Sequence, residues 1–144
     1  MKKFIAIMVL PAFALTGCFT DDKPVISATS CAIDAPTKGA VVPLGQPMVV
    51  GGWAYDKIGN NRIAPEVKVQ ITSITRDMSK TFDAKPVKRP DVAKAFNDPR
   101  LEGAGFTAEV PANSVNPGVY EVTILQKFGN SVVACGAEHT IEIK

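Results

Sequence analysis

The apolar residues between positions 48 and 143 recur mostly at every second position, which is the spacing of strands that bury one face. Turn signals such as Pro117-Gly118 and Gly129-Asn130 separate the alternating segments. The predicted strands are 48–56, 67–74, 81–85, 106–110, 119–128, 131–135 and 139–143. About seven short strands with turns between them are typical of antiparallel β-sandwiches, so the pattern predicts an all-β fold.

Two aromatic residues have predicted places in this sandwich. In the strand 48–56, Trp53 and Tyr55 share one face, and Val50 and Ala54 share the other. Because large aromatic side chains dominate burial, Trp53 is expected to fill the core between the sheets; an exposed ring that stacks on a sugar is the alternative. Tyr120 follows a turn and is expected to hydrogen-bond back to a nearby loop, as in a tyrosine corner.

One segment, residues 90–97, breaks the period of two and predicts a short helix that covers an end of the sandwich. Pro90 suits the first helical position, and Asp91 suits the positive end of the helix dipole. Arg89 and Asp91 bracket the helix start. We expect them to pair with each other or with backbone groups and to fix the strand-to-helix turn; ligand binding is the alternative.

The start of the chain predicts export. Lys2 and Lys3 precede an apolar run of twelve residues, 4–15, which suits a signal peptide and is shorter than the roughly 20 residues that span a bilayer. The following Leu15-Thr16-Gly17-Cys18 resembles the lipobox of bacterial lipoproteins. The resemblance implies that residues 1–17 are removed and that Cys18 carries a covalent lipid. An ordinary secretory signal with an incidental cysteine is the alternative.

The lipobox also bears on localisation and domain boundaries. Phe19, rather than an inner-membrane-retaining Asp, follows Cys18 and favours the outer membrane, on its periplasmic face or at the cell surface. Residues 18–30 are polar and are expected to form a lipidated N-terminus and flexible tether, and residues 31–144 the folded domain. Apart from the lipid on Cys18, no cofactor is predicted.

Charge narrows the class of partner. Two of the 16 Lys and Arg residues, Lys2 and Lys3, lie in the signal, which leaves 14 against 14 acidic residues in the mature chain. A neutral exported protein has no electrostatic case for binding nucleic acid. The expected partners are the membrane, through the lipid anchor, and an envelope protein or a glycan.

With Cys18 acylated, Cys31 and Cys135 are the remaining cysteines. An even pair in an exported protein predicts a disulfide. It would close a loop of about 105 residues and contribute about 4–5 kcal/mol at the upper end of the chain-entropy estimate. Two free thiols that bind a metal with His139 are the alternative, but zinc sites need more ligands at recognisable spacing, so no metal site is predicted.

The residues give no signature of catalysis. His139 is the one histidine and lies in an alternating strand, where a structural role is expected. No nucleophile elbow or paired-carboxylate signature accompanies it, so the chain is not expected to be an enzyme. The basic segment 76–89, which includes Lys88, predicts a solvated edge strand; a surface for acidic partners is the alternative.

Four short motifs are similar to those of an Ig-like accessory module found in bacterial envelope and glycosyltransferase-associated proteins. They occur in the expected order within residues 49–125: Gly52-Trp53-Ala54, Arg89-Pro90-Asp91-Val92-Ala93 with Phe96, Gly105-Phe106, and Pro117-Gly118-Val119-Tyr120. The resemblance implies the Ig-like fold more than any activity. Trp53, Lys88, Arg89 and Asp91 are therefore candidates for a binding or a structural motif.

Three functions fit the sequence. The leading hypothesis is a lipid-anchored, non-catalytic adaptor that binds an envelope protein or a glycan. The second is a structural envelope lipoprotein without a discrete ligand. The third is an inhibitor or receptor-blocking lipoprotein, as some phages encode, which would insert a protruding loop such as residues 86–97 into its target.

Overall fold

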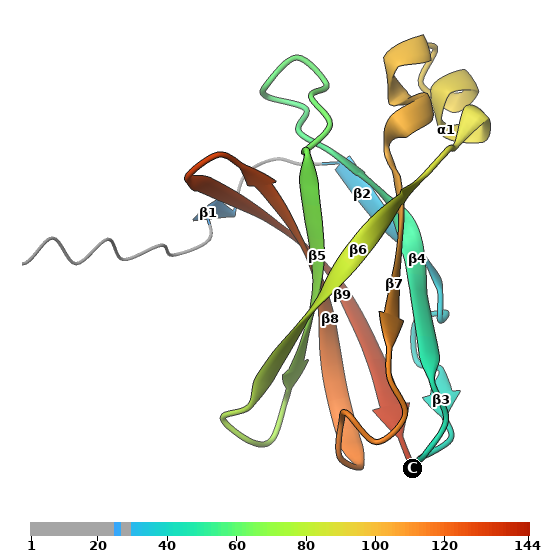
Figure 1. Cartoon of the computed structure of the whole chain (residues 1–144), viewed down its shortest axis with the longest axis vertical. Helices are drawn as coiled ribbons and strands as arrows, with labels where there is room; N and C mark the ends of the chain where they lie inside the picture. Colours follow the sequence, from blue (N-terminus) through green and yellow to red (C-terminus); the bar gives the residue numbers. More distant parts are fainter. Residues whose placement is uncertain (1–24, 27–29) are drawn as a thin grey trace, which may run out of the picture.

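The computed structural model describes residues 25–26 and 30–144, which form a curled sheet of nine strands (Figure 1). The strands are β1 (Val25–Ile26), β2 (Ser30–Ala35), β3 (Val41–Val42), β4 (Met48–Tyr55), β5 (Glu66–Ser73), β6 (Ser79–Val87), β7 (Gly105–Val110), β8 (Gly118–Phe128) and β9 (Ser131–Ile143). Their order is β1-β9-β8-β5-β6-β7-β4-β2, and β3 pairs with β9. The predicted all-β sandwich is confirmed. The predicted signal peptide and Cys18 lie outside the described residues.

Strand β6 connects the two layers of the sandwich. Its residues 79–83 pair with β5, and its residues 84–87 pair with β7. The sequence placed the end of this strand before Pro86, which is wrong, because Pro86 lies within β6 opposite Phe106. Proline is tolerated there because β5 has already separated from β6, and an edge position does not require a second ladder hydrogen bond.

The main core lies between the layers and follows the predicted alternation. Buried side chains from β4, β5 and β8 meet there: Val50, Ala54, Val69, Ile71, Val122 and Ile124. Phe106 and Tyr120 add aromatic volume to the same cluster. The period of two therefore locates this core correctly.

The Cys31–Cys135 disulfide joins β2, at one end of the strand order, to β9, near the other end. The predicted pairing is confirmed, with 6.4 Å between the two Cα atoms. Nearby, the buried His139 donates from Nε2 to the Pro36 carbonyl oxygen at 2.7 Å. The disulfide and the hydrogen bond from His139 both join the segment of β2 and Pro36 to β9, and they close the curl of the sheet. His139 therefore makes a structural contact.

The strand count differs from the prediction in two places. The segments predicted as 131–135 and 139–143 are one strand, β9, with an irregularity opposite Val122 and Thr123. Three strands, β1, β2 and β3, were missed; β1 and β3 pair in parallel with β9, and β2 pairs antiparallel with β4. Strand β1 lies inside the segment predicted to be a tether, so part of that segment belongs to the fold.

The predicted tyrosine corner is confirmed. The Tyr120 hydroxyl donates to the Asn116 carbonyl oxygen at 2.7 Å. The Arg76 guanidinium donates from Nη2 to the Pro117 carbonyl at 2.6 Å and to the Tyr120 hydroxyl at 3.3 Å. These bonds fix the turn that precedes β8 to the turn that follows β5.

Candidate functional site

Two short helices stand at one end of the sandwich, beside the loop 57–65 (Figure 1). Helix α1 (Pro90–Ala95) confirms the predicted helix and begins with proline at its first turn. The 3-10 helix η1 (Pro99–Gly103) was missed, although Asp98-Pro99 is a typical helix start. The Asp98 side chain accepts a hydrogen bond from the Arg100 amide at 3.1 Å. We call α1, η1 and the loop 57–65 the helical end.

A second, smaller core lies under these helices and contains Trp53. Its buried members are Tyr55, Val92, Leu101 and Ala104, and Trp53 packs against them. The Trp53 ring stacks on Tyr55 with centroids 5.9 Å apart and meets the edge of Phe96 at 5.3 Å. The prediction that Trp53 fills the core between the sheets is therefore wrong. Its neighbours Val50 and Ala54 face that core, and Trp53 points to the opposite face of β4, which α1 and η1 cover.

A buried carboxylate shapes the loop at the helical end. Asp56 is only 4 % exposed, and its Oδ2 accepts from Arg62 Nη2 at 2.7 Å. Its Oδ1 accepts from the Ile58 amide at 3.1 Å. The hydrogen bond from Arg62 is the main cause that holds the pKa of Asp56 below its usual value. Arg62 in turn lies 4.5 Å above the Phe128 ring, so the loop is fixed to the β8–β9 hairpin.

A second carboxylate ties η1 to the same loop. Asp98 accepts from Arg100 Nε at 2.9 Å and from Arg100 Nη2 at 2.7 Å. Its Oδ2 also accepts from the side-chain Nδ2 of Asn61 at 3.0 Å. These hydrogen bonds, from Arg100 first and then from Asn61, hold the pKa of Asp98 well below its usual range. The helices and the loop therefore form one connected unit.

The predicted pairing of Arg89 with Asp91 is confirmed, and a third residue joins it. Arg89 donates from Nε and Nη2 to the two carboxylate oxygens of Asp91 at 2.8 and 2.7 Å. Its Nη1 donates to Asp34, on β2, at 2.6 Å. The hydrogen bonds from Arg89 lower the pKa of Asp91 to about 2. Sequence reasoning missed Asp34 because it lies 55 residues away from Arg89.

An open groove of about 320 Å³ runs over the outer face of the β7–β4–β2 layer, beside this cluster. Its lining residues are Asp34, Ala35, Gly51, Gly52, Val87, Arg89, Phe106 and Thr107. A Cβ atom at Gly52 would collide with the backbone of Ala32, so only glycine permits β2 to lie this close to β4. Arg89 and Asp34 thus form a polar wall of a groove whose floor is mostly backbone and small side chains.

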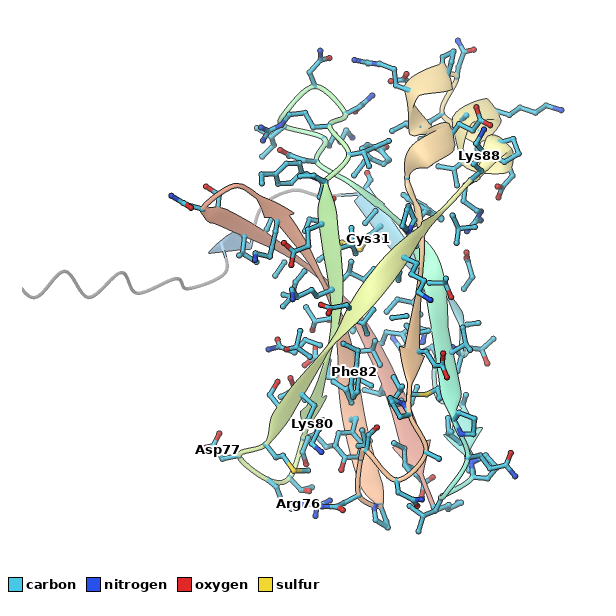
Figure 2. The ribbon with its side chains drawn as sticks, viewed as in Figure 1. Cys31, Arg76, Asp77, Lys80, Phe82 and Lys88 are labelled. Atoms are coloured by element: carbon cyan, nitrogen blue, oxygen red, sulfur yellow. A yellow bond between two sulfur atoms is a disulfide. The ribbon has the colours of Figure 1, made fainter. Side chains whose placement is uncertain are left out.

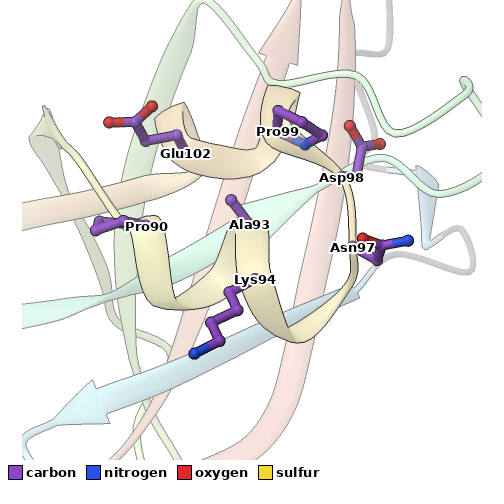
Figure 3. A pocket seen from close by; sticks show the side chains of 7 residues that line it. All are labelled: Pro90, Ala93, Lys94, Asn97, Asp98, Pro99 and Glu102. Atoms are coloured by element: carbon purple, nitrogen blue, oxygen red, sulfur yellow. The ribbon is translucent and has the colours of Figure 1, made fainter.

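A second hollow of about 310 Å³ separates α1 from η1 (Figure 3). Several polar groups that line it already have partners. Asp98 is bonded to Arg100 and Asn61, and Glu102 lies 3.7 Å from the exposed Lys88. This hollow therefore offers a ligand fewer unused polar groups than its volume suggests.

The basic residues of segment 76–89 do not form one patch. Figure 2 shows Arg76 and Lys80 at the end of the sandwich opposite Lys88. Arg76 bonds to the tyrosine corner, and Lys80 donates to the Ser114 carbonyl oxygen. Residues 79–87 of this segment form β6, which lies between β5 and β7 in the strand order; each half of β6 pairs with only one of these two strands.

Among residues 25–26 and 30–144, no group of three or more His, Cys, Asp or Glu side chains is placed to hold a metal ion. No helix in the same part of the chain is long and apolar enough to cross a bilayer. No protein-family model and no curated protein matches this chain.

Proposed function

We propose that this protein is a lipid-anchored, non-catalytic adaptor of the bacterial envelope, and that it binds a protein partner in the groove over β4 and β7. The groove beside Arg89 and Asp34 carries the proposal, because it is an open concave surface on a rigid sheet with polar groups at one wall. The lipobox-like start of the chain supports anchoring at Cys18, and Phe19 directly after it favours the outer membrane.

The composition of the groove favours a protein over a glycan. Sugar recognition by stacking needs an exposed aromatic face. Phe106, the one aromatic residue that lines the groove, is 3 % exposed and belongs to the main core. Trp53 does not line the groove and is half-buried against Tyr55 and Phe96. Backbone groups, Val87 and Thr107 instead suit an extended peptide segment or a protein loop.

The charge pairs at the helical end support a non-catalytic role. A general acid or base works best when its pKa lies near the working pH. The carboxylates of Asp56, Asp91 and Asp98 all have lowered pKa values, because an arginine donates to each of them. At neutral pH these groups remain charged and hold the structure together.

The test is crosslinking of the mature lipidated protein in its own envelope, followed by affinity purification and mass spectrometry. Thr107→Arg fills the groove, and Thr123→Arg places the same change on β8, in the opposite layer. We expect one dominant partner that is lost with Thr107→Arg and retained with Thr123→Arg. Equal recovery of that partner with both variants would show that the groove is not the binding surface.

The projection of α1 and η1 supports a second candidate, an inhibitor or receptor-blocking lipoprotein that acts with this end (Figure 1). Phe96 and Lys88 are exposed there. In this case Phe96→Ser and Lys88→Glu would abolish inhibition and Thr107→Arg would not. If no partner is enriched and none of these variants has an effect, the structural envelope lipoprotein is the better description.

A further inference from the structure

A rigid loop exposes an isoleucine at the helical end. Ile58 is 71 % exposed, more than any other large hydrophobic residue in the described part of the chain. Its amide donates to Asp56, and the backbones of Asp56 and Arg62 bond to each other at 2.8 and 3.1 Å. Asn60 and Asn61 adopt left-handed backbone angles, with φ of 59° and 57°. Ile58 is therefore held outward by a structured turn, at the cost of exposing apolar surface to water.

Two ion pairs beside this loop expose their cations and bury their anions, although Asp91 and Glu102 at the same end are 63 % and 49 % exposed. The side chains of Asp56 and Asp98 are 6 % and 11 % exposed, whereas those of their partners Arg62 and Arg100 are 56 % and 58 % exposed. Lys57 precedes Ile58 directly, and no ion pair within the described residues involves it. An exposed aliphatic side chain among cations suits the boundary between anionic headgroups and acyl chains.

Strand β1 begins beside the helical end. Three strand pairings locate Val25 of β1: it lies opposite Val133 of β9, which lies opposite Gln126 of β8, which lies opposite Val67 of β5. Val25 is therefore level with the first residues of β5, next to the loop 57–65. Strand β1 is parallel to β9, which runs from the β8–β9 hairpin, beside the loop, toward the opposite end. The N-terminal side of Val25 therefore faces the helical end. Cys18 precedes Val25 by seven residues, a length of chain that spans roughly 25 Å at most.

We propose that the helical end rests on the membrane, with Ile58 inserted below the headgroups and Lys57 and Arg62 beside anionic lipid phosphates. This inference depends on the lipid anchor at Cys18 that the proposed function includes. It leaves the groove over β4 and β7 at the side of the domain, open to a protein partner.

The test uses the lipidated protein in vesicles of phosphatidylethanolamine and phosphatidylglycerol, with a nitroxide on Ile58→Cys. The control is Ile74→Cys, an exposed isoleucine at the turn after β5, at the opposite end. Flotation with the vesicles first establishes that the protein is anchored. We expect the label at position 58 to gain oxygen accessibility and to lose access to a water-soluble nickel reagent, by several-fold relative to position 74.

Each outcome separates the two proposals. Failure to float would overturn both the anchor and the membrane contact. Flotation with equally water-exposed labels at 58 and 74 would overturn the membrane contact alone. This holds even if the label at position 58 becomes protected in native envelopes, because a protein would then cover Ile58. The membrane contact also predicts that Lys57→Glu, or vesicles of phosphatidylcholine, should restore access of the nickel reagent to the label at position 58 without loss of flotation.

Discussion

The body of the sandwich and its helical end are stabilised by different interactions. The body has an apolar core that spans both layers, and the Cys31–Cys135 disulfide closes it. The small core at the helical end has four buried members, Tyr55, Val92, Leu101 and Ala104. This end also depends on hydrogen bonds to carboxylates, two of which join segments far apart in sequence, from Asn61 to Asp98 and from Arg89 to Asp34. Apolar burial resists acid and salt, whereas exposed ion pairs do not. The helical end should therefore loosen under conditions that leave the body folded.

The only tryptophan allows the two regions to be observed separately. Trp53 lies in the small core of the helical end. Its fluorescence reports on that end, while far-ultraviolet circular dichroism reports mainly on the strands of the body. The four predictions below use these two signals.

The largest effect is expected from the disulfide. Replacing Cys31 and Cys135 together by alanine should lower the free energy of unfolding by about 4 kcal/mol, because the bridge spans 104 residues of sequence. Urea titration followed by circular dichroism measures the change. Under native conditions the Trp53 emission should remain that of the parent protein. A loss below about 1 kcal/mol would mean that β3 and His139 close the sheet without the bridge.

The next comparison truncates one fully buried side chain in each region. Ile124→Ala in the body should cost about 2–5 kcal/mol of global stability, with both signals changing together. Leu101→Ala in the helical end should instead separate the signals, so that Trp53 fluorescence changes at lower urea than circular dichroism. If Leu101→Ala gives one coincident transition, the two cores unfold as one unit and the comparison fails.

The third prediction concerns a variant that should raise the free energy of unfolding. Gln126 is fully buried in β8, and neither of its amide atoms has a hydrogen-bond partner within the described residues. Gln126→Met keeps the length of the side chain and removes the cost of the buried amide, so the free energy of unfolding should rise by about 1–2 kcal/mol. The matched control, Gln70→Met on the partly exposed β5 position, should have little effect. A destabilised Gln126→Met would indicate that the amide is bonded to internal water.

The body was predictable from sequence because alternation follows directly from strand geometry. The same alternation grouped Trp53 with Tyr55 correctly but could not say which face of β4 points inward. The side on which Trp53 packs depends on η1, which supplies Leu101 to the small core beside Trp53 and was not predicted. Arg89 and Asp91 are two residues apart, so their pairing could be expected, whereas Asp34 reaches them only through the pairing of β2 with β4. Tertiary placement, rather than local pattern, decides these contacts.

Acid should affect the helical end before the body. The pKa values of Asp56, Asp91 and Asp98 are lowered in the folded protein, and that of Asp91 falls to about 2 from an ordinary value of 3.8. Because the folded pKa lies below the unfolded one, these groups stabilise the protein fully above pH of about 4, and this contribution is lost as the pH falls toward about 2. Trp53 fluorescence should change over this range while circular dichroism remains constant.

Asp98→Asn tests whether the carboxylates cause this transition. The amide keeps the size of the side chain but cannot attract Arg100 by charge, so η1 should already be loosened at neutral pH and the acid transition should be smaller. Asp77→Asn, in the turn before β6 at the opposite end, is the control and should leave the transition unchanged (Figure 2). If circular dichroism and Trp53 fluorescence change together in the parent protein, acid unfolds the body directly and the ion pairs at the helical end are not its weakest point.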